Sequence, residues 1–308
     1  MEQNTRRGYL VAILSALILA WTGIFIRYVT VNYQMPALIL AFWRNLFVTV
    51  VLLPILLLFR PKLLKVKPQD FRFLVQFALM LVLFNSFWTT SVAMTGAAVA
   101  TVLVYSSSAF TAILDRLVNQ EKISFQKAGA IGLCLAGCVL VSEVLDAEVW
   151  TVNALGIAAG LLSGFMYAVY TLFGRSAAKG GIHTWTTIFY TFFLAAIVFL
   201  ILNLLPLGFL PGTAAIPEEM VWLGDAWQGW LALVMLAAGP TLLGYGTYNL
   251  ALQDLPSSVV NLIVTSEPVF TTLIAYVLLG ERMNLVQAIG SLLIIGGVVL
   301  MRLKLEGK

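Results

Sequence analysis

Residues 99–141 read VATVLVYSSSAFTAILDRLVNQEKISFQKAGAIGLCLAGCVLV, and residues 259–301 read VVNLIVTSEPVFTTLIAYVLLGERMNLVQAIGSLLIIGGVVLM. The two stretches overlay without a gap when the first is shifted by 160 positions. Each contains an apolar run, an acidic–basic pair and a second apolar run. Matches of the less common residue types argue against coincidence: Phe110 and Thr111 fall on Phe270 and Thr271, Glu121 on Glu281, and Gly137 on Gly297. The chain therefore repeats itself.

The composition places the chain in a membrane. Of its 308 residues, 61% are apolar and 10% are charged, whereas a soluble domain is about 45–50% apolar and about 25% charged. A membrane-spanning helix needs about 20 predominantly apolar residues. The sequence therefore predicts an all-α integral membrane protein with ten transmembrane helices, at residues 8–26, 36–59, 73–93, 97–115, 127–143, 152–174, 184–205, 227–251, 257–279 and 283–302.

Lysine and arginine are distributed unequally between the two ends of these helices. With the N-terminus inside, the inner side carries fifteen of them and the outer side two, Arg27 and Arg282. Cytoplasmic loops carry such an excess, so we expect a multi-pass protein of the cell (inner) membrane with both termini cytoplasmic. The uncharged run 8–26 exceeds the apolar core of a secretory signal, which predicts a retained first helix.

Five helices fall in each half of the chain, at residues 1–146 and 147–308. Because five is an odd number, the two halves should enter the membrane from opposite sides. Inverted repeats are a recurring architecture of secondary transporters, which alternate access by rocking one half against the other around a midplane site. A shift of 148 positions also aligns the first helix of each half, where small residues every four positions indicate close helix contact: Gly8, Ala12, Ala16 and Ala20 fall over Gly156, Gly160, Gly164 and Ala168.

Two segments resemble a known family. Ala41-Phe42-Trp43-Arg44 and the run from Glu267-Pro268 to Glu281-Arg282, with its first-half copy from Phe110 to Lys122, are similar to the drug/metabolite transporter superfamily of EamA type. The resemblance implies a transporter of small metabolites, often amino acids, frequently outward, without an ATPase subunit. One departure is Ser108, where the family often has a proline, opposite Pro268 in the other half.

Arg44 and Glu267 are the only charged residues well inside a predicted helix. Burying such a residue costs at least about 2.5 kcal/mol on insertion scales, so it usually faces the bundle interior. The rise of a helix places both near the midplane. Two roles remain open: an ion pair between the helices, which the similar depths favour, or a separate Glu267 that couples protons to transport.

Helix 227–251 contains Gly239-Pro240, and an interrupted helix is the best sequence indication of a transporter site. Asn85 and Trp88 lie on one helix face and fall on Tyr245 and Tyr248 under the shift of 160. This pattern predicts a polar and aromatic pocket supplied by both halves, although such aromatic residues also serve as ordinary packing. The candidate substrate-binding residues are Arg44, Asn85, Trp88, Tyr105, Ser107, Tyr245, Tyr248, Asn249 and Glu267.

The remaining residue types argue for a transporter rather than an enzyme. Cys134 and Cys138 are four apart in an apolar run and are expected to be small packing residues, and His183 is the single histidine. We expect no catalytic residues, cofactor or metal. We also expect no nucleic acid, because the basic residues form no stripe, and no P-loop ATPase.

The expected partners are a small-molecule substrate, the lipid bilayer and, in the second role of Glu267, protons. The alternatives are a multidrug exporter of lipophilic cations and, in another class, a membrane-embedded receptor or enzyme.

Overall fold

The computed structural model describes residues 2–95, 97–141, 154–205, 211–214, 216–279 and 284–303. Over these ranges all of the regular structure is helical. The elements are α1 (Glu2–Tyr33), α2 (Ala37–Phe59), η1 (Pro61–Leu64), α3 (Pro68–Thr95), α4 (Ala97–Tyr105), α5 (Ser107–Val118), α6 (Phe125–Val141), α7 (Ala154–Lys179), α8 (Thr184–Leu204), η3 (Pro217–Val221), α9 (Trp227–Leu236), η4 (Ala237–Gly244), α10 (Tyr245–Asp254), α11 (Ser257–Val264), α12 (Glu267–Leu279) and α13 (Leu285–Leu303).

Eight helical stretches of the described chain are long and apolar enough to cross a membrane, and two apolar helices, Phe125–Val141 and Leu285–Met301, are shorter. The outer surface carries large apolar side chains such as Leu58, 78% exposed, and Val277, 74% exposed. Apolar surface on this scale favours lipid over water. The protein is therefore a multi-pass membrane protein, and its described residues form helices.

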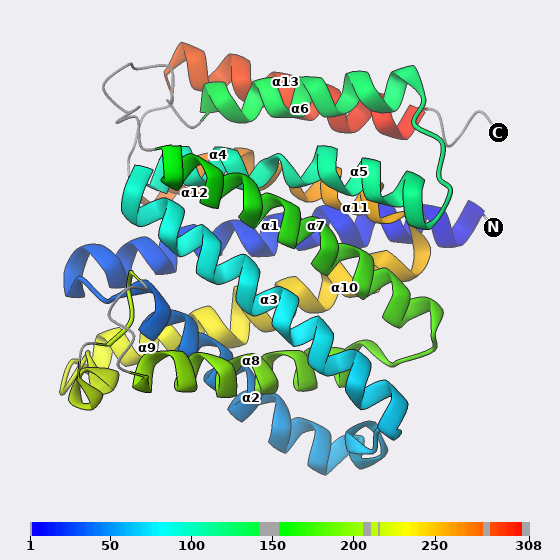
Figure 1. Cartoon of the computed structure of the whole chain (residues 1–308). Coiled ribbons are helices and arrows are strands. Elements are labelled where there is room, and N and C mark those ends of the chain that lie inside the picture. Colours follow the sequence, from blue (N-terminus) through cyan, green and yellow to red (C-terminus); the bar gives the residue numbers. More distant parts are fainter. Residues whose placement is uncertain are drawn as a thin grey trace.

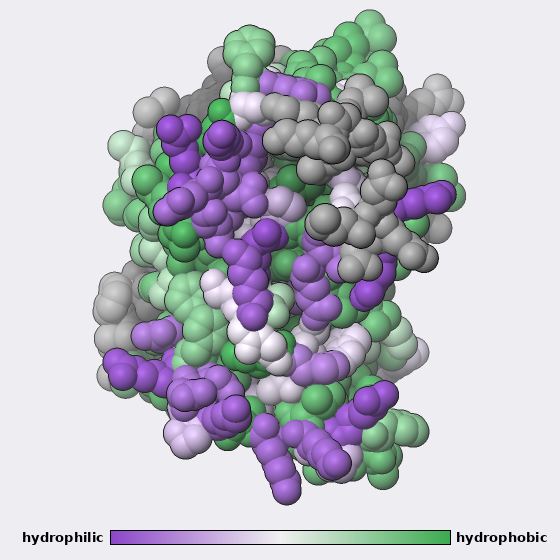
Figure 2. All heavy atoms as spheres, turned by 90° about the vertical axis from the view of Figure 1, so that its right-hand side faces the viewer, coloured by the Kyte–Doolittle hydropathy of each residue, from purple (hydrophilic) through white to green (hydrophobic). Residues whose placement is uncertain are grey.

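α1 begins and α13 ends at the same side of the molecule (Figure 1). We call this side the terminal side. Figure 2 views it directly, and hydrophilic residues extend from its upper part through its centre to its lower edge, while apolar residues lie mostly at its sides. The connection from α5 to α6 and the turn from α7 to α8 lie at the same side (Figure 1). Both ends of the described helical region and these two connections therefore share one side.

Each main helix contact joins an element before residue 141 to one after residue 154. α1 packs on α10, α2 on α8, α3 on α7, α5 on α11 and α6 on α13. The pair of α6 and α13 forms one edge of the molecule (Figure 1), where a Cβ on Gly137 would lie 2.5 Å from the Gly290 carbonyl oxygen and one on Gly297 2.6 Å from Cys134 Sγ. Cys134 and Cys138 are both buried in this contact region, so they pack helices together, as expected.

Two helices predicted to be continuous are broken. Residues 97–115 were expected to form one helix, as were 257–279, but the chain turns at Ser106 and at Thr265–Ser266. The Ser106 hydroxyl donates to the Leu103 carbonyl oxygen at 2.5 Å, and the Ser266 hydroxyl donates to that of Ile263 at 2.6 Å. Serine hydroxyls compete with the backbone in this way and weaken helices. The two breaks lie 160 residues apart.

The interruption predicted at Gly239-Pro240 is confirmed. Between α9 and α10 the chain forms η4, a π-helical segment that contains Pro240. Proline has no amide hydrogen to donate to the preceding turn, and π-helical segments occur mostly as local bulges, frequently at functional sites. α3 lacks an internal proline and runs unbroken from Pro68 to Thr95.

The glycines of α7 bring it against α3 and α4. A Cβ on Gly160 would lie 2.5 Å from Leu103 Cδ1 and 2.7 Å from Ser91 Oγ, and one on Gly164 would lie 2.6 Å from Ser106 Oγ. A side chain at either position would force neighbouring atoms to shift. The predicted close helix contact is confirmed, and it falls beside the break between α4 and α5.

Candidate functional site

Arg44 lies on α2 and is 7% exposed. Its Nη2 donates to Oδ1 of Asn85 on α3 at 2.8 Å, and the Asn85 amide donates to the Leu81 carbonyl oxygen at 2.8 Å. Tyr245, the first residue of α10, lies within electrostatic range of the guanidinium. Nε of Arg44 has no hydrogen-bond partner among the described residues. A buried cation thus faces neutral groups.

Glu267 is the first residue of α12, directly after the break at Thr265–Ser266. The positive end of a helix dipole stabilises a carboxylate in this place. Its side chain is partly exposed. Three tyrosines, Tyr105, Tyr167 and Tyr245, lie within electrostatic range of it.

The expected ion pair between Arg44 and Glu267 is absent. The ion pairs between described residues join other partners, Arg7 with Asp254 and Arg175 with Glu121. Depth along a helix fixes only one coordinate of a side chain, and Asn85 occupies the place beside Arg44 that the carboxylate was expected to take. Tyr245 lies within electrostatic range of both charges. The preference for pairing was therefore wrong for this conformation.

A second group of polar side chains connects four helices. The Tyr248 hydroxyl on α10 and the Thr171 hydroxyl on α7 lie 2.6 Å apart. The Asn261 amide on α11 donates to Thr171 Oγ1 at 3.3 Å, and the Ser107 hydroxyl on α5 donates to Asn261 Oδ1 at 3.2 Å. All four residues are buried. We call this group the polar hub. It joins α5, from before residue 141, to α7, α10 and α11, from after residue 154.

Sequence reasoning placed Tyr248 and Ser107 in the candidate site but missed Thr171 and Asn261. A single asparagine in the apolar run Ser257–Val264 was the available signal for Asn261. Thr171 carried none, because threonine is common in membrane helices and bonds its own backbone, as it does here to the Tyr167 carbonyl oxygen at 2.9 Å. The amide of Asn249, another predicted binding residue, donates to the Tyr245 carbonyl oxygen at 2.9 Å.

Trp88 and Tyr248, the predicted matching walls of a pocket, differ in burial. Trp88 is half-buried, while Tyr248 is fully buried. The ring of Tyr248 lies 6.2 Å from that of Tyr167, which in turn stacks on Tyr170 at 6.1 Å and lies 5.0 Å from Phe84. The ring that lies against Tyr248 is therefore Tyr167 of α7. The sequence did not indicate Tyr167 and Tyr170.

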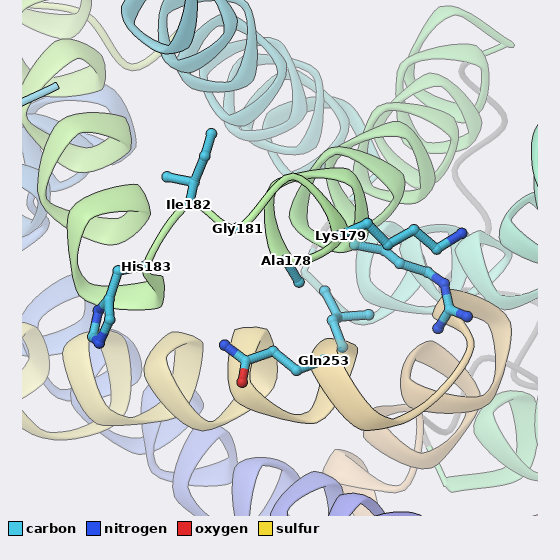
Figure 3. Close-up of a pocket in the computed structure, with 8 residues that line it drawn as sticks. Ala178, Lys179, Gly181, Ile182, His183 and Gln253 are labelled. Carbon is cyan, nitrogen blue, oxygen red and sulfur yellow. The ribbon is translucent and has the colours of Figure 1, made fainter. Parts of the chain in front are cut away.

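A hollow of about 340 Å³ lies elsewhere, at the turn between α7 and α8. Figure 3 shows Gln253 and His183 beside it, with Lys179 extending away from both. The Gln253 amide donates to the Thr184 hydroxyl at 2.9 Å. None of the predicted binding residues lines it; the lining residues are Arg175, Ala178, Lys179, Gly181, Ile182, His183, Leu252 and Gln253. The hollow is a notch at the terminal side, distinct from the group around Arg44 and Glu267.

Known proteins resemble the chain in sequence and in fold. An uncharacterized transporter of Archaeoglobus fulgidus is 28% identical over 290 residues, covering 94% of this chain and 95% of that protein. A second one from that organism is 26% identical over 201 residues, 65% of this chain and 66% of that protein. The uncharacterized transporter YdfC of Bacillus subtilis is 28% identical over 211 residues, 68% of this chain and 64% of YdfC.

A crystal structure of a protein 16% identical in sequence has the same fold, with a TM-score of 0.76 over 97% of this chain and 98% of that one. The sequence profile of the EamA-like transporter family matches residues 6–143 and residues 154–303. These two matches cover nearly all of the described helices. The chain belongs to the EamA-like transporter family of the drug/metabolite transporters.

Proposed function

We propose that this protein is a secondary transporter that moves a small zwitterionic metabolite, such as an amino acid, across the membrane by alternating access. The family and the relatives are named as transporters rather than as enzymes. One observation carries the choice of substrate class. Arg44 is buried, and the partner that it contacts is the neutral Asn85 rather than a carboxylate.

The energetics of burial explain why this observation indicates a carboxylate ligand. A central arginine costs about 2.5–3.5 kcal/mol on insertion scales, and a neutral amide offsets only part of that cost. A substrate carboxylate would supply the missing charge and accept from the unpartnered Nε. Glu267 would meet the ammonium group, and Tyr245 lies within electrostatic range of both charges. Arg44 and Glu267 would then be separate substrate contacts.

The proposed architecture has ten transmembrane helices in two inverted halves, residues 1–146 and 147–308. Counting α6 and α13 as spans adds the two shorter apolar helices to the eight long ones. Two features support the repeat: the serine breaks lie 160 residues apart, and the family profile matches each half. We place both termini in the cytoplasm, because the basic residues gather at their side.

The alternative substrate class is a lipophilic cation. The partly exposed Glu267, within electrostatic range of Tyr105 and Tyr167, favours it, since carboxylates and aromatic faces both attract cations. A cation exporter would use Glu267 and would leave Arg44 without a ligand. In either case Glu267 is the candidate for coupling protons to transport.

A matched ligand set tests the proposal. Thermal unfolding of the purified protein would be followed with amino acids, with their amides and decarboxylated amines, and with lipophilic cations. We expect stabilisation by amino acids alone, and we expect Arg44→Gln to remove it. Arg116→Gln is the control, because Arg116 is exposed at the end of α5. Equal stabilisation by amines, or an unchanged response of Arg44→Gln, would contradict the carboxylate assignment.

A further inference from the structure

Charged and polar groups connect the helices at the terminal side. Asp115, near the end of α5, is fully buried. Its Oδ2 accepts from the backbone amide of Ser258, in the first turn of α11, at 2.7 Å, and its Oδ1 accepts from the Asn119 amide at 2.9 Å. A carboxylate at the N-terminus of a helix is stabilised by free amides and by the dipole. Asp115 therefore fastens α5 to α11.

Arg175, near the end of α7, makes a second connection. Its Nη1 donates to the carbonyl oxygen of Leu255, which follows α10. Its Nη2 lies 3.7 Å from Oε1 of Glu121, in the connection between α5 and α6. On the same helix, Lys179 Nζ donates to Asn119 Oδ1 at 2.8 Å. Arg175 thus joins α7 to the end of α10 and to the connection between α5 and α6.

α1 and α6 complete this arrangement. Arg7 Nε lies 3.6 Å from Asp254 Oδ2, and a Cβ on Gly8 would lie 2.7 Å from Leu255 Cγ. Lys127 on α6 is 6% exposed and lies within electrostatic range of Asp115 and Glu121. The ends of α1, α5, α7, α10 and α11 are therefore held together at one side.

These contacts lie about one helical turn from the polar hub, toward the terminal side. Thr171 of the hub and Arg175 are four residues apart on α7, so they lie on one helix face about 6 Å apart along the axis. Asn261 of the hub and Ser258 are three apart on α11. A path from Arg44 and Glu267 to the terminal side would cross the hub first and the charged contacts second.

We propose that Asp115, Glu121 and Arg175 form a latch that holds the terminal side closed, so that the structure represents the conformation shut toward that side. This inference rests on the proposed transport function, because only a transporter has to open the same side again. The contacts suit reversible opening. The pair of Arg175 and Glu121 is partly exposed, at 16% and 28%, and pairs of this kind shift an equilibrium by only a few-fold.

Cysteine labelling measures opening directly. Ala112 lies between the hub and Asp115 on α5 and is 2% exposed, so a thiol there would react only when the terminal side opens. Ala112→Cys would be placed in a Cys134→Ala, Cys138→Ala background. The rate of alkylation by a hydrophilic maleimide would be measured in detergent, with monodispersity checked for each variant. Glu121→Gln is the test and Lys122→Gln the matched control, because Lys122 is the exposed neighbour.

We expect Glu121→Gln to raise the labelling rate about two- to fivefold and Lys122→Gln to leave it unchanged. The exchanged pair Glu121→Arg, Arg175→Glu should bring the rate back toward that of the parent, which a purely local disturbance of folding would not do. Equal rates in Glu121→Gln and Lys122→Gln would overturn the latch. The labelling experiment needs no cargo. If the labelling rates are as expected but no solute flux is found, the transport function is contradicted and the latch is not.

Discussion

Arg44 hydrogen-bonds Asn85, 41 residues away in sequence, and neither ion pair of the described residues involves Glu267. The cost of a buried charge indicated that Arg44 and Glu267 point inward. Their depths indicated the midplane. Neither argument fixes rotation about the helix or the lateral position of a neighbour, so the partner of Arg44 could not be predicted.

Because Glu267 and Arg44 form no ion pair, we expect Glu267→Gln to have little effect on stability. Breaking a buried pair costs about 3–5 kcal/mol, whereas a glutamate without a cationic partner has no such loss. We expect the free energy of unfolding to change by less than about 1 kcal/mol, with no coupling to Arg44→Met in a double-mutant cycle. If Glu267 couples protons, the variant should lose pH-gradient-driven uptake and keep substrate exchange. A large destabilisation that Arg44→Met relieves would restore the pairing role.

Trp88 and Tyr248 should respond differently to substitution. Tyr248 is fully buried and bonded to Thr171, so Tyr248→Ala should cost about 3–5 kcal/mol of stability and Tyr248→Phe about 1 kcal/mol. Trp88 is half-buried, and Trp88→Ala should weaken cargo binding in a folded, monodisperse protein. Thermal unfolding and a binding titration on the same samples check both. Unchanged affinity in Trp88→Ala would make this residue ordinary packing.

At the element scale, the sequence indicated one interruption and missed two. Pro240 removes a backbone donor, and this effect can be predicted from one residue. Ser106 and Ser266 bond carbonyls three residues back, but many serines in helices bond their own backbone without breaking the helix. Their effect depends on neighbours such as Gly164, whose added Cβ would lie 2.6 Å from Ser106 Oγ.

Close packing of α7 predicts a strong effect of side chains at Gly160. Because a Cβ there would lie 2.5 Å from Leu103 Cδ1, we expect Gly160→Leu to lower stability by at least about 1–3 kcal/mol through overpacking. Gly132→Leu on α6 is the matched control, since a Cβ at Gly132 would meet no atom within 4 Å. Thermal unfolding in one detergent compares the two. Equal losses would show that α7 can move away from α3 and α4.

At the scale of the whole molecule, composition, apolar run lengths and the internal repeat predicted a helical membrane protein of repeated design. The sequence could not predict which helices pack against each other, because in lipid one apolar helix face packs about as well on another. The exceptions are local signals. Gly156, Gly160 and Gly164 marked a close contact, which the structure places against α3 and the break between α4 and α5.

Topology follows from the position of the terminal side. Reporter fusions at Lys308 and within residues 60–72 should both score cytoplasmic, and one within residues 206–226 should score outside. The physical reason is the excess of lysine and arginine on one side. A cytoplasmic score at 206–226 would remove the ten-helix count and the inverted repeat with it.

The proposed function requires the protein to carry a zwitterionic solute across the bilayer between Arg44 and Glu267. We would test this by counterflow of a labelled amino acid in liposomes that contain the purified protein. We expect saturable uptake without ATP, absent from protein-free liposomes, abolished by Arg44→Gln and preserved by Arg116→Gln. Amino-acid uptake no greater than in protein-free liposomes, or uptake that Arg44→Gln leaves intact, would contradict the proposed function.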